Sequence, residues 1–270
     1  MPAPFDVPFM QRALVESLLL AGLAGVLGSW IVLRRLAFFT HGVGTAAFPG
    51  LVVAGPAGVA PQLTGLAAAL LYSGGVEWLG RTRRVAVDAA TGLVLVGALA
   101  LGVILASDVF ETGAGVDRLL FGSLIGLSDR DLWLTGGALA AALVLHLTLR
   151  RSWLAQGFDP GAARALGVRA ELADRLLLLA VAIAAVVALD AVGALLVTAV
   201  LVIPAATVRL VAPSVATLQV GTAALAAVEG VAGLWIAYEL DVGPGPAIAV
   251  LGGAVFAAVA VGAAAARRWA

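Results

Sequence analysis

The sequence predicts an all-α protein that crosses a membrane several times, and two observations lead to this class. Hydrophobic residues make up 62% of the 270 residues and charged residues only 12%, whereas soluble domains have ~45–50% and ~25%. The apolar residues also run in long stretches, and a helix needs ~20 of them to cross ~30 Å of hydrocarbon. We therefore expect a polytopic transmembrane helical bundle that forms a single domain over residues 1–270.

Charged residues and Pro/Gly clusters divide the chain into about nine predicted spans, with eight as the alternative count because the sixth is short. A further stretch, Val116–Leu127, resembles a re-entrant or interfacial helix. The predicted spans are Ala13–Leu33, Phe38–Val59, Leu63–Leu79, Ala89–Ser107, Leu132–Leu149, Leu176–Leu189, Val192–Val211, Leu218–Ala237 and Pro246–Ala266.

The basic residues predict how the chain is oriented. All of them are arginines, and most fall in loops on one side of the predicted spans, while carboxylates collect on the other side. Cytoplasmic loops carry the excess of basic residues in membrane proteins. We therefore expect a membrane protein with its N-terminus outside and its C-terminus in the cytoplasm. The arginines on the predicted inner side are Arg34, Arg35, Arg81, Arg83, Arg84, Arg150, Arg151, Arg164, Arg169, Arg175, Arg209, Arg267 and Arg268.

Composition also excludes several classes of function. The formal net charge is zero, so the chain lacks the basic surplus with which nucleic-acid binders neutralise phosphates. It has no lysine for a Walker A loop and no cysteine for a thiolate metal site. Neither a Gly-x-Ser-x-Gly frame nor a His-Glu-x-x-His motif is present, which argues against an intramembrane protease. An ion-coupled secondary transporter stays open as an alternative, although no convincing internal repeat is visible.

Two features inside the spans bear on helix packing. Ala21 and Gly25, and likewise Ala24 and Gly28, are four residues apart, a spacing that lets helix backbones approach closely. Pro204 lies in the middle of a span, where it frees a backbone carbonyl and kinks the helix. A kinked bundle of small residues is typical of a protein that moves.

The longest arginine-rich connection runs from Arg150 to Arg175 and contains the signals of a short helix. Asp159 can serve as N-cap, Pro160 suits the first helical position and Gly167 can end the helix. From spacing alone, a linker helix on the membrane surface is favoured over a segment that inserts into a groove of another protein.

Several stretches, taken in order along nearly the whole chain, resemble the permease subunits of ABC importers for zinc, manganese and iron. The segment Phe158–Gly167 is similar to the coupling helix of that family. Val192–Val197, followed by Val202–Thr207, resembles the most recognisable span of the family. The stretches that carry the resemblance are Phe9–Leu14, Val32–Leu36, Ala46–Gly50, Phe121–Gly126, Phe158–Gly167, Val192–Val197, Val202–Thr207, Leu240–Asp241 and Gly243–Ile248.

The resemblance implies a location in the bacterial plasma membrane and a set of partners. Two copies of the chain form the translocation path as a homodimer in the lipid bilayer, two cytoplasmic ABC ATPase subunits bind beneath, and an extracytoplasmic metal-binding protein delivers the cation. No cofactor is bound permanently, because the divalent metal is the cargo. The resemblance also reverses the preference for a surface linker, since the coupling helix fits a groove of the ATPase. The residues of that helix expected to make the contact are Phe158, Asp159, Pro160, Ala163, Arg164, Ala165, Leu166 and Gly167.

The chain departs from the metal motif of the family, which is an aspartate followed four residues later by a histidine. The corresponding residues here are His41 and Thr45, with Gly44 at the usual serine position. Residues i and i+4 share a helix face, so both can line the path, but the carboxylate is missing and threonine is a weak ligand. The altered motif leaves a metal chelate as an alternative cargo.

Glu229 is the candidate for the missing carboxylate. It lies in the middle of the eighth span, where an ionised side chain is costly and is usually functional. We hypothesise that Glu229 faces the dimer path, against the alternative of a neutral carboxyl that hydrogen-bonds between helices. His146 and Glu16, in contrast, are interpreted as residues at the membrane interface.

Overall fold

The computed structural model describes residues 5, 7–80, 87–110, 126–158, 170–193 and 196–269, and the described part is built from helices alone. The predicted all-α class is therefore confirmed for this part of the chain. The helices are α1 (Pro8–Leu23), η2 (Ala24–Gly28), α2 (Ser29–Leu33), α3 (Ala37–Ala46), α4 (Phe48–Ala57), α5 (Pro61–Gly80), α6 (Val87–Ile104), η3 (Leu105–Val109), α8 (Asp129–Phe158), α10 (Ala170–Val192), α11 (Val197–Arg209), α12 (Val215–Leu240) and α13 (Pro244–Trp269).

Seven helical segments in the described residues are long and apolar enough to cross a membrane. The expected count of about nine is not confirmed, because α5 and the 13-residue α11 are outside those seven. The seven segments are Pro8–Leu33, Ala37–Ala57, Ala89–Val109, Asp129–Gly157, Leu172–Leu189, Val215–Leu240 and Pro244–Ala266.

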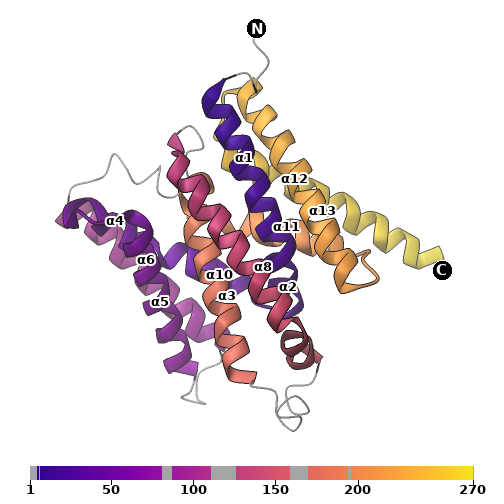
Figure 1. Ribbon diagram of the computed structural model, residues 1–270, viewed down its shortest axis with the longest axis horizontal. Helices are drawn as coiled ribbons and strands as arrows, with labels where there is room; N and C mark the ends of the chain where they lie inside the picture. Colours follow the sequence, from indigo (N-terminus) through magenta and orange to yellow (C-terminus); the bar gives the residue numbers. More distant parts are fainter. Residues whose placement is uncertain are drawn as a thin grey trace.

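The helices form a bundle with a buried centre and exposed flanks. Figure 1 shows α4, α5 and α6 grouped on one side and α12 and α13 on the other, with α1, α8 and α10 between them. In the first span, 67% of the apolar window is buried, against 17% in the last one. An apolar helix that is exposed over most of its surface faces lipid or another chain, so α13 belongs to the periphery.

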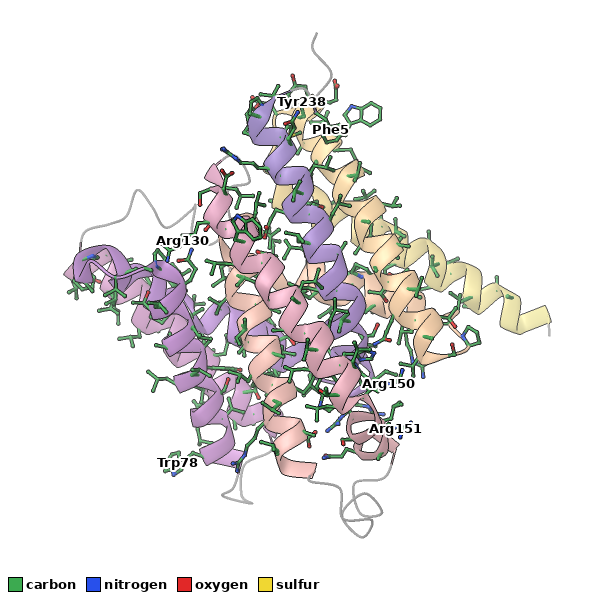
Figure 2. The ribbon with its side chains drawn as sticks, in the orientation of Figure 1. Phe5, Trp78, Arg130, Arg150, Arg151 and Tyr238 are labelled. Atoms are coloured by element: carbon green, nitrogen blue, oxygen red, sulfur yellow. The ribbon has the colours of Figure 1, made fainter. Side chains whose placement is uncertain are left out.

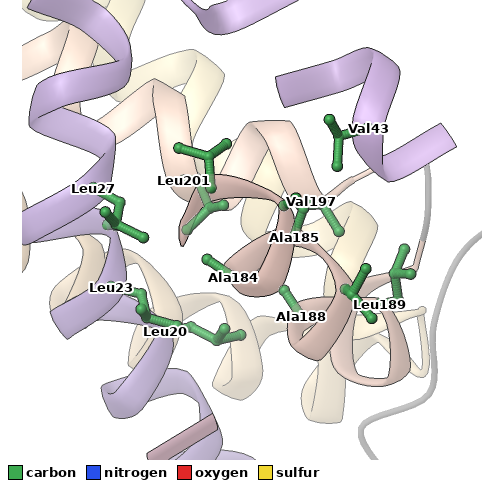
Figure 3. Close-up of a cluster of buried hydrophobic side chains, with 14 of the residues drawn as sticks. Leu20, Leu23, Leu27, Val43, Ala184, Ala185, Ala188, Leu189, Val197 and Leu201 are labelled. Carbon is green, nitrogen blue, oxygen red and sulfur yellow. The ribbon is translucent and has the colours of Figure 1, made fainter. Parts of the chain in front are cut away.

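The centre of the bundle is filled by small and branched aliphatic side chains. Figure 3 shows Leu20, Leu23 and Leu27 facing alanines of α10, next to Leu201 of α11. Alanines on α10 let the neighbouring helices come close, because lipid itself supplies no hydrophobic force between helices. The alanines in this cluster are Ala184, Ala185 and Ala188.

The small-residue spacing in the first span marks a close contact, as predicted. A Cβ atom added at Gly28 would lie 2.1 Å from the carbonyl oxygen of Leu201, and one at Gly25 would lie 2.7 Å from the Cβ of Ala223. Both glycines belong to the π-helical turn η2. The backbone of η2 therefore packs directly against α11 and α12, and the absence of side chains at these two glycines makes the approach possible.

Candidate functional site

His41 and Thr45 lie on α3, just before an interruption between α3 and α4. Proline at position 49 has no N–H and cannot donate to the carbonyl of Thr45, four residues earlier, so the helical hydrogen bonding breaks at this turn. Ala47 is the residue between the two helices, and its N–H donates to the carbonyl of Val43. The motif therefore sits where a helix inside the bundle is broken.

His41 is partly buried and reaches across to α11. Its Nδ1 lies 3.4 Å from Oγ1 of Thr198, in the first turn of α11. Gly193, with φ of 81°, ends α10 shortly before this turn, a conformation that glycine adopts without strain. The turn after α10 thus carries Thr198 to the motif. The sequence contains no signal for this contact, because the two residues are 157 positions apart.

Thr45 offers two oxygens at the same break. Its side chain is 2% exposed, and Oγ1 has no hydrogen-bond partner among the described residues. Its carbonyl loses the usual helical donor four residues later, because Pro49 has no N–H. A buried hydroxyl without a hydrogen-bond partner is costly. The site is therefore suited to a ligand that interacts with this hydroxyl.

Glu229 is buried elsewhere in the same chain. It lies on α12, is 3% exposed, and its Oε1 has no hydrogen-bond partner among the described residues. The carboxylate borders a small cavity of about 20 Å³ between α1, α11, α12 and α13, which is room for about one water molecule. The other residues around the cavity include Ser17, Val200, Ile203, Pro204 and Gly252.

The structure brings His41 and Thr45 onto one helix but does not place Glu229 against them. Thr198, the partner of His41, and Ala199, beside the cavity of Glu229, are neighbours on α11. Helix α11 therefore lies between the motif and the carboxylate. Within the described ranges, no group of three or more His, Cys, Asp or Glu side chains is placed to hold a metal ion.

Pro204 lies inside α11, as predicted, and contributes to the cavity of Glu229. Because proline has no N–H, the carbonyl of Val200 loses its helical donor. Val200 borders the same cavity. The missing helical hydrogen bond of α11 is thus directly beside the buried carboxylate.

The two residues interpreted as interfacial both turn inward. Glu16 is fully buried and accepts a hydrogen bond of 2.8 Å from Oγ1 of Thr135 on α8, so it is held between two helices. His146 accepts a hydrogen bond of 3.0 Å from the indole N–H of Trp30 and packs between Trp30 and Trp153. Helix periodicity alone does not reveal either partner.

Most of the expected coupling helix lies outside the described residues. Phe158 is the last residue of α8, and the chain is described again from Ala170, the first residue of α10. The residues Asp159, Pro160, Ala163, Arg164, Ala165, Leu166 and Gly167 fall between these two points. The connection thus joins the ends of two long helices that pack against each other.

Comparisons with known proteins match nearly the whole chain. The family model of the ABC 3 transport family matches residues 6–263. The manganese import system permease protein ScaB of Streptococcus parasanguinis is 31% identical over 248 residues, covering 92% of this chain and 88% of that protein. The manganese transport system membrane protein MntC of Halalkalibacterium halodurans is 29% identical over 249 residues, covering 92% and 85%.

A solved structure has the same fold. PsaBC from Streptococcus pneumoniae, determined in complex with Fab, superposes with a TM-score of 0.86 at 27% sequence identity. The match covers 94% of this chain and 91% of that chain. The helices described above therefore have the arrangement found in PsaBC.

Proposed function

The chain belongs to the ABC 3 transport family, and we propose that it is the membrane-spanning permease subunit of an ABC importer for a divalent metal ion. The observation that carries this proposal is the family match over residues 6–263, together with relatives named as manganese transport permeases. The chain itself is not an enzyme. ATP is hydrolysed on a separate ATPase chain, and manganese, iron or zinc is the cargo.

The protein crosses the plasma membrane nine times, with the N-terminus outside and the C-terminus in the cytoplasm. The 20-residue α5 supports the higher count, because Trp78 near its end lies at the opposite end of the bundle from Phe5 (Figure 2). Arg150 and Arg151 lie toward the end opposite Tyr238 in the same view. This asymmetry supports the orientation, since basic residues collect on the cytoplasmic side.

Two copies of the chain form the path, and each takes one ATPase through the connection between α8 and α10. The homodimer is supported by the sparse burial of α8 and α13, in each of which 17% of the apolar window is buried. An extracytoplasmic metal-binding protein delivers the ion at the outer end. Replacing Leu166 with Asp in the coupling segment is expected to abolish capture of the ATPase by the purified permease.

His41 and Thr45 are the residues that touch the ion in the path. The imidazole is a ligand for transition metals, and the hydroxyl and freed carbonyl of Thr45 are oxygen donors of the kind that suit manganese. Glu229 supplies negative charge from the far side of α11. This arrangement replaces the single carboxylate of the family motif with weaker, separated groups.

The test is uptake by the complex reconstituted with its ATPase and binding protein. Wild type is expected to accumulate at least one of manganese, iron and zinc, only with ATP. His41→Ala and Thr45→Val are each expected to lower uptake roughly tenfold or more. Thr148→Val is the matched control, because Thr148 is exposed and bonds only to carbonyls of its own helix.

Two results would count against these proposals separately. Uphill accumulation by the chain alone would indicate a secondary transporter and overturn the importer. ATP-dependent uptake that is unchanged in both His41→Ala and Thr45→Val would keep the importer but overturn the site. Uptake of a metal chelate without uptake of any free ion would overturn the proposed cargo, a free divalent ion.

A further inference from the structure

A ligand-sized cavity lies at the arginine-rich end of the bundle, away from His41, Thr45 and Glu229. Its volume is about 330 Å³, which is within the range of small-molecule sites. It is enclosed by the ends of α2 and α8 and by the turn between α11 and α12. The site described above does not use this cavity.

The charge around the cavity is positive. Arg34 and Arg209 both line it, and no carboxylate is among its described lining residues. Arg34 is held in place, because its Nη2 lies 2.7 Å from Oδ1 of Asp174 and its Nη1 donates to the carbonyl of Trp153. Arg209 is exposed and has no ion pair with any described residue. One guanidinium is therefore fixed in the cavity and a second is free to bind an anion.

The remaining wall is apolar and aromatic. Trp30 and Trp153 are almost fully buried and meet edge to face, with ring centroids 5.4 Å apart. Their indole N–H groups are already used, since Trp30 donates to His146 and Trp153 to the carbonyl of Ala173. Leu33, Leu154 and Leu218 complete this wall. An occupant must therefore be anionic at the arginine side and apolar at the tryptophan side.

The position of the cavity in the membrane points to the same chemistry. Arginine next to tryptophan at helix ends is typical of the interface between headgroups and hydrocarbon. Val211, two residues beyond Arg209, is 64% exposed, so the turn between α11 and α12 presents apolar surface beside the free guanidinium. Basic pockets between helices on the cytoplasmic side are known to hold lipid headgroups.

We propose that this cavity binds one anionic phospholipid of the cytoplasmic leaflet in each copy of the chain. The phosphate lies against Arg209, where guanidinium can bind it through two parallel hydrogen bonds, while Arg34, paired with Asp174, forms the wall behind it. The glycerol and the first acyl carbons lie along the partly exposed Leu33 and Leu154, in front of the buried tryptophans. The inference rests on the proposed orientation of the chain but not on its transport activity.

The experiment measures lipid retention by the purified full-length chain, without transport. Chain taken from vesicles of equal phosphatidylglycerol and phosphatidylcholine is analysed by native mass spectrometry. Wild type is expected to keep one phosphatidylglycerol per copy. Arg209→Gln is expected to lower this preference about fivefold, the effect of one basic residue at an anionic surface. Ala212→Trp, which fills the cavity without changing charge, is expected to lower retention as well.

Arg151→Gln is the matched control, because Arg151 is exposed at the same end of α8 and does not line the cavity. Equal loss in Arg151→Gln and Arg209→Gln would indicate diffuse surface charge and overturn the site. Displacement of the bound lipid by inorganic phosphate or glycerol phosphate at millimolar concentration would indicate a free-phosphate site instead. Normal lipid retention with loss of ATPase binding in Arg209→Gln would assign the arginine to the ATPase and also overturn the proposal.

Discussion

Two glutamates lie inside the bundle at a similar depth, and their surroundings differ. Glu16 is on α1 and Glu229 on α12, and the residues that follow them, Ser17 and Gly230, pack directly against each other. Glu16 accepts a hydrogen bond from Thr135 across the contact between α1 and α8. Glu229 borders a cavity and accepts no hydrogen bond from the described residues.

The difference separates a structural acid from a candidate functional one. A buried carboxyl that is hydrogen-bonded across two helices holds them together, and removing it leaves a polar group and a void. A buried carboxyl that accepts no hydrogen bond and borders a cavity costs stability, and such a cost is typical of sites that bind or move charge. Stability and transport should therefore respond oppositely at the two positions.

The largest expected effect is on stability at Glu16. Glu16→Ala should lower the free energy of unfolding by about 2–4 kcal/mol, because it leaves Thr135 without its acceptor and opens a void in a tight interface. Glu16→Gln keeps an acceptor and nearly the same volume, so it should cost less than about 1 kcal/mol. Tryptophan fluorescence during thermal unfolding in nanodiscs measures both. Equal stability of Glu16→Ala and wild type would contradict the structural role.

At Glu229 the expected effect is on transport. Glu229→Gln should lower ATP-dependent metal uptake by roughly tenfold or more, while stability stays the same or rises, since a carboxyl without a partner is replaced by a neutral amide. Glu239→Gln on the same helix is the control, because Glu239 is exposed. Unchanged uptake in Glu229→Gln would contradict the transport role of Glu229 and leave both glutamates as structural acids.

A smaller effect is expected at the partner of Glu16. Thr135→Val has nearly the same shape and should lower the free energy of unfolding by about 1 kcal/mol, since one buried hydrogen bond is lost. Combining it with Glu16→Gln in a double-mutant cycle isolates the coupling, expected at about 0.5–1 kcal/mol. A coupling near zero would mean that other groups, and not Thr135, stabilise Glu16.

The smallest effect is expected at a second contact between the same two helices. Arg12 pairs with Asp129 at 2.9 Å, but the side chains are 45% and 73% exposed. Exposed ion pairs contribute little because water screens them, so Arg12→Gln should change the free energy of unfolding by less than about 0.5 kcal/mol. The same thermal measurement, repeated at high salt, checks this. A loss as large as that of Glu16→Ala would show that burial does not govern this interface.

Much of the fold was predictable because hydrophobic stretches and arginine placement are properties of local sequence. The small-residue spacing at Gly25 and Gly28 also predicted close helix contacts correctly. The span count was harder to predict, since α11 has only 13 residues. The position of Glu16 near the start of the first predicted span did not reveal its partner, because the hydrogen bond comes from Thr135, a residue 119 positions away.

For the candidate site, the sequence located His41, Thr45, Pro204 and Glu229 but not their mutual positions. Resemblance to a motif places residues along one helix, and the helix period then places His41 and Thr45 on one face. The period cannot say that α11 lies between them and Glu229, or that Thr198 meets His41. These facts depend on how separate helices pack.

The sequence by itself determined that this protein is a helical membrane bundle and where seven of its apolar segments lie. These properties follow from transfer of side chains between water and lipid, and each segment expresses them independently of the others. Only the tertiary structure decided which buried polar groups find partners. The hydrogen bond of Glu16 and the cavity beside Glu229 depend on contacts between segments that are far apart in the chain. Local hydrophobicity does not determine these contacts.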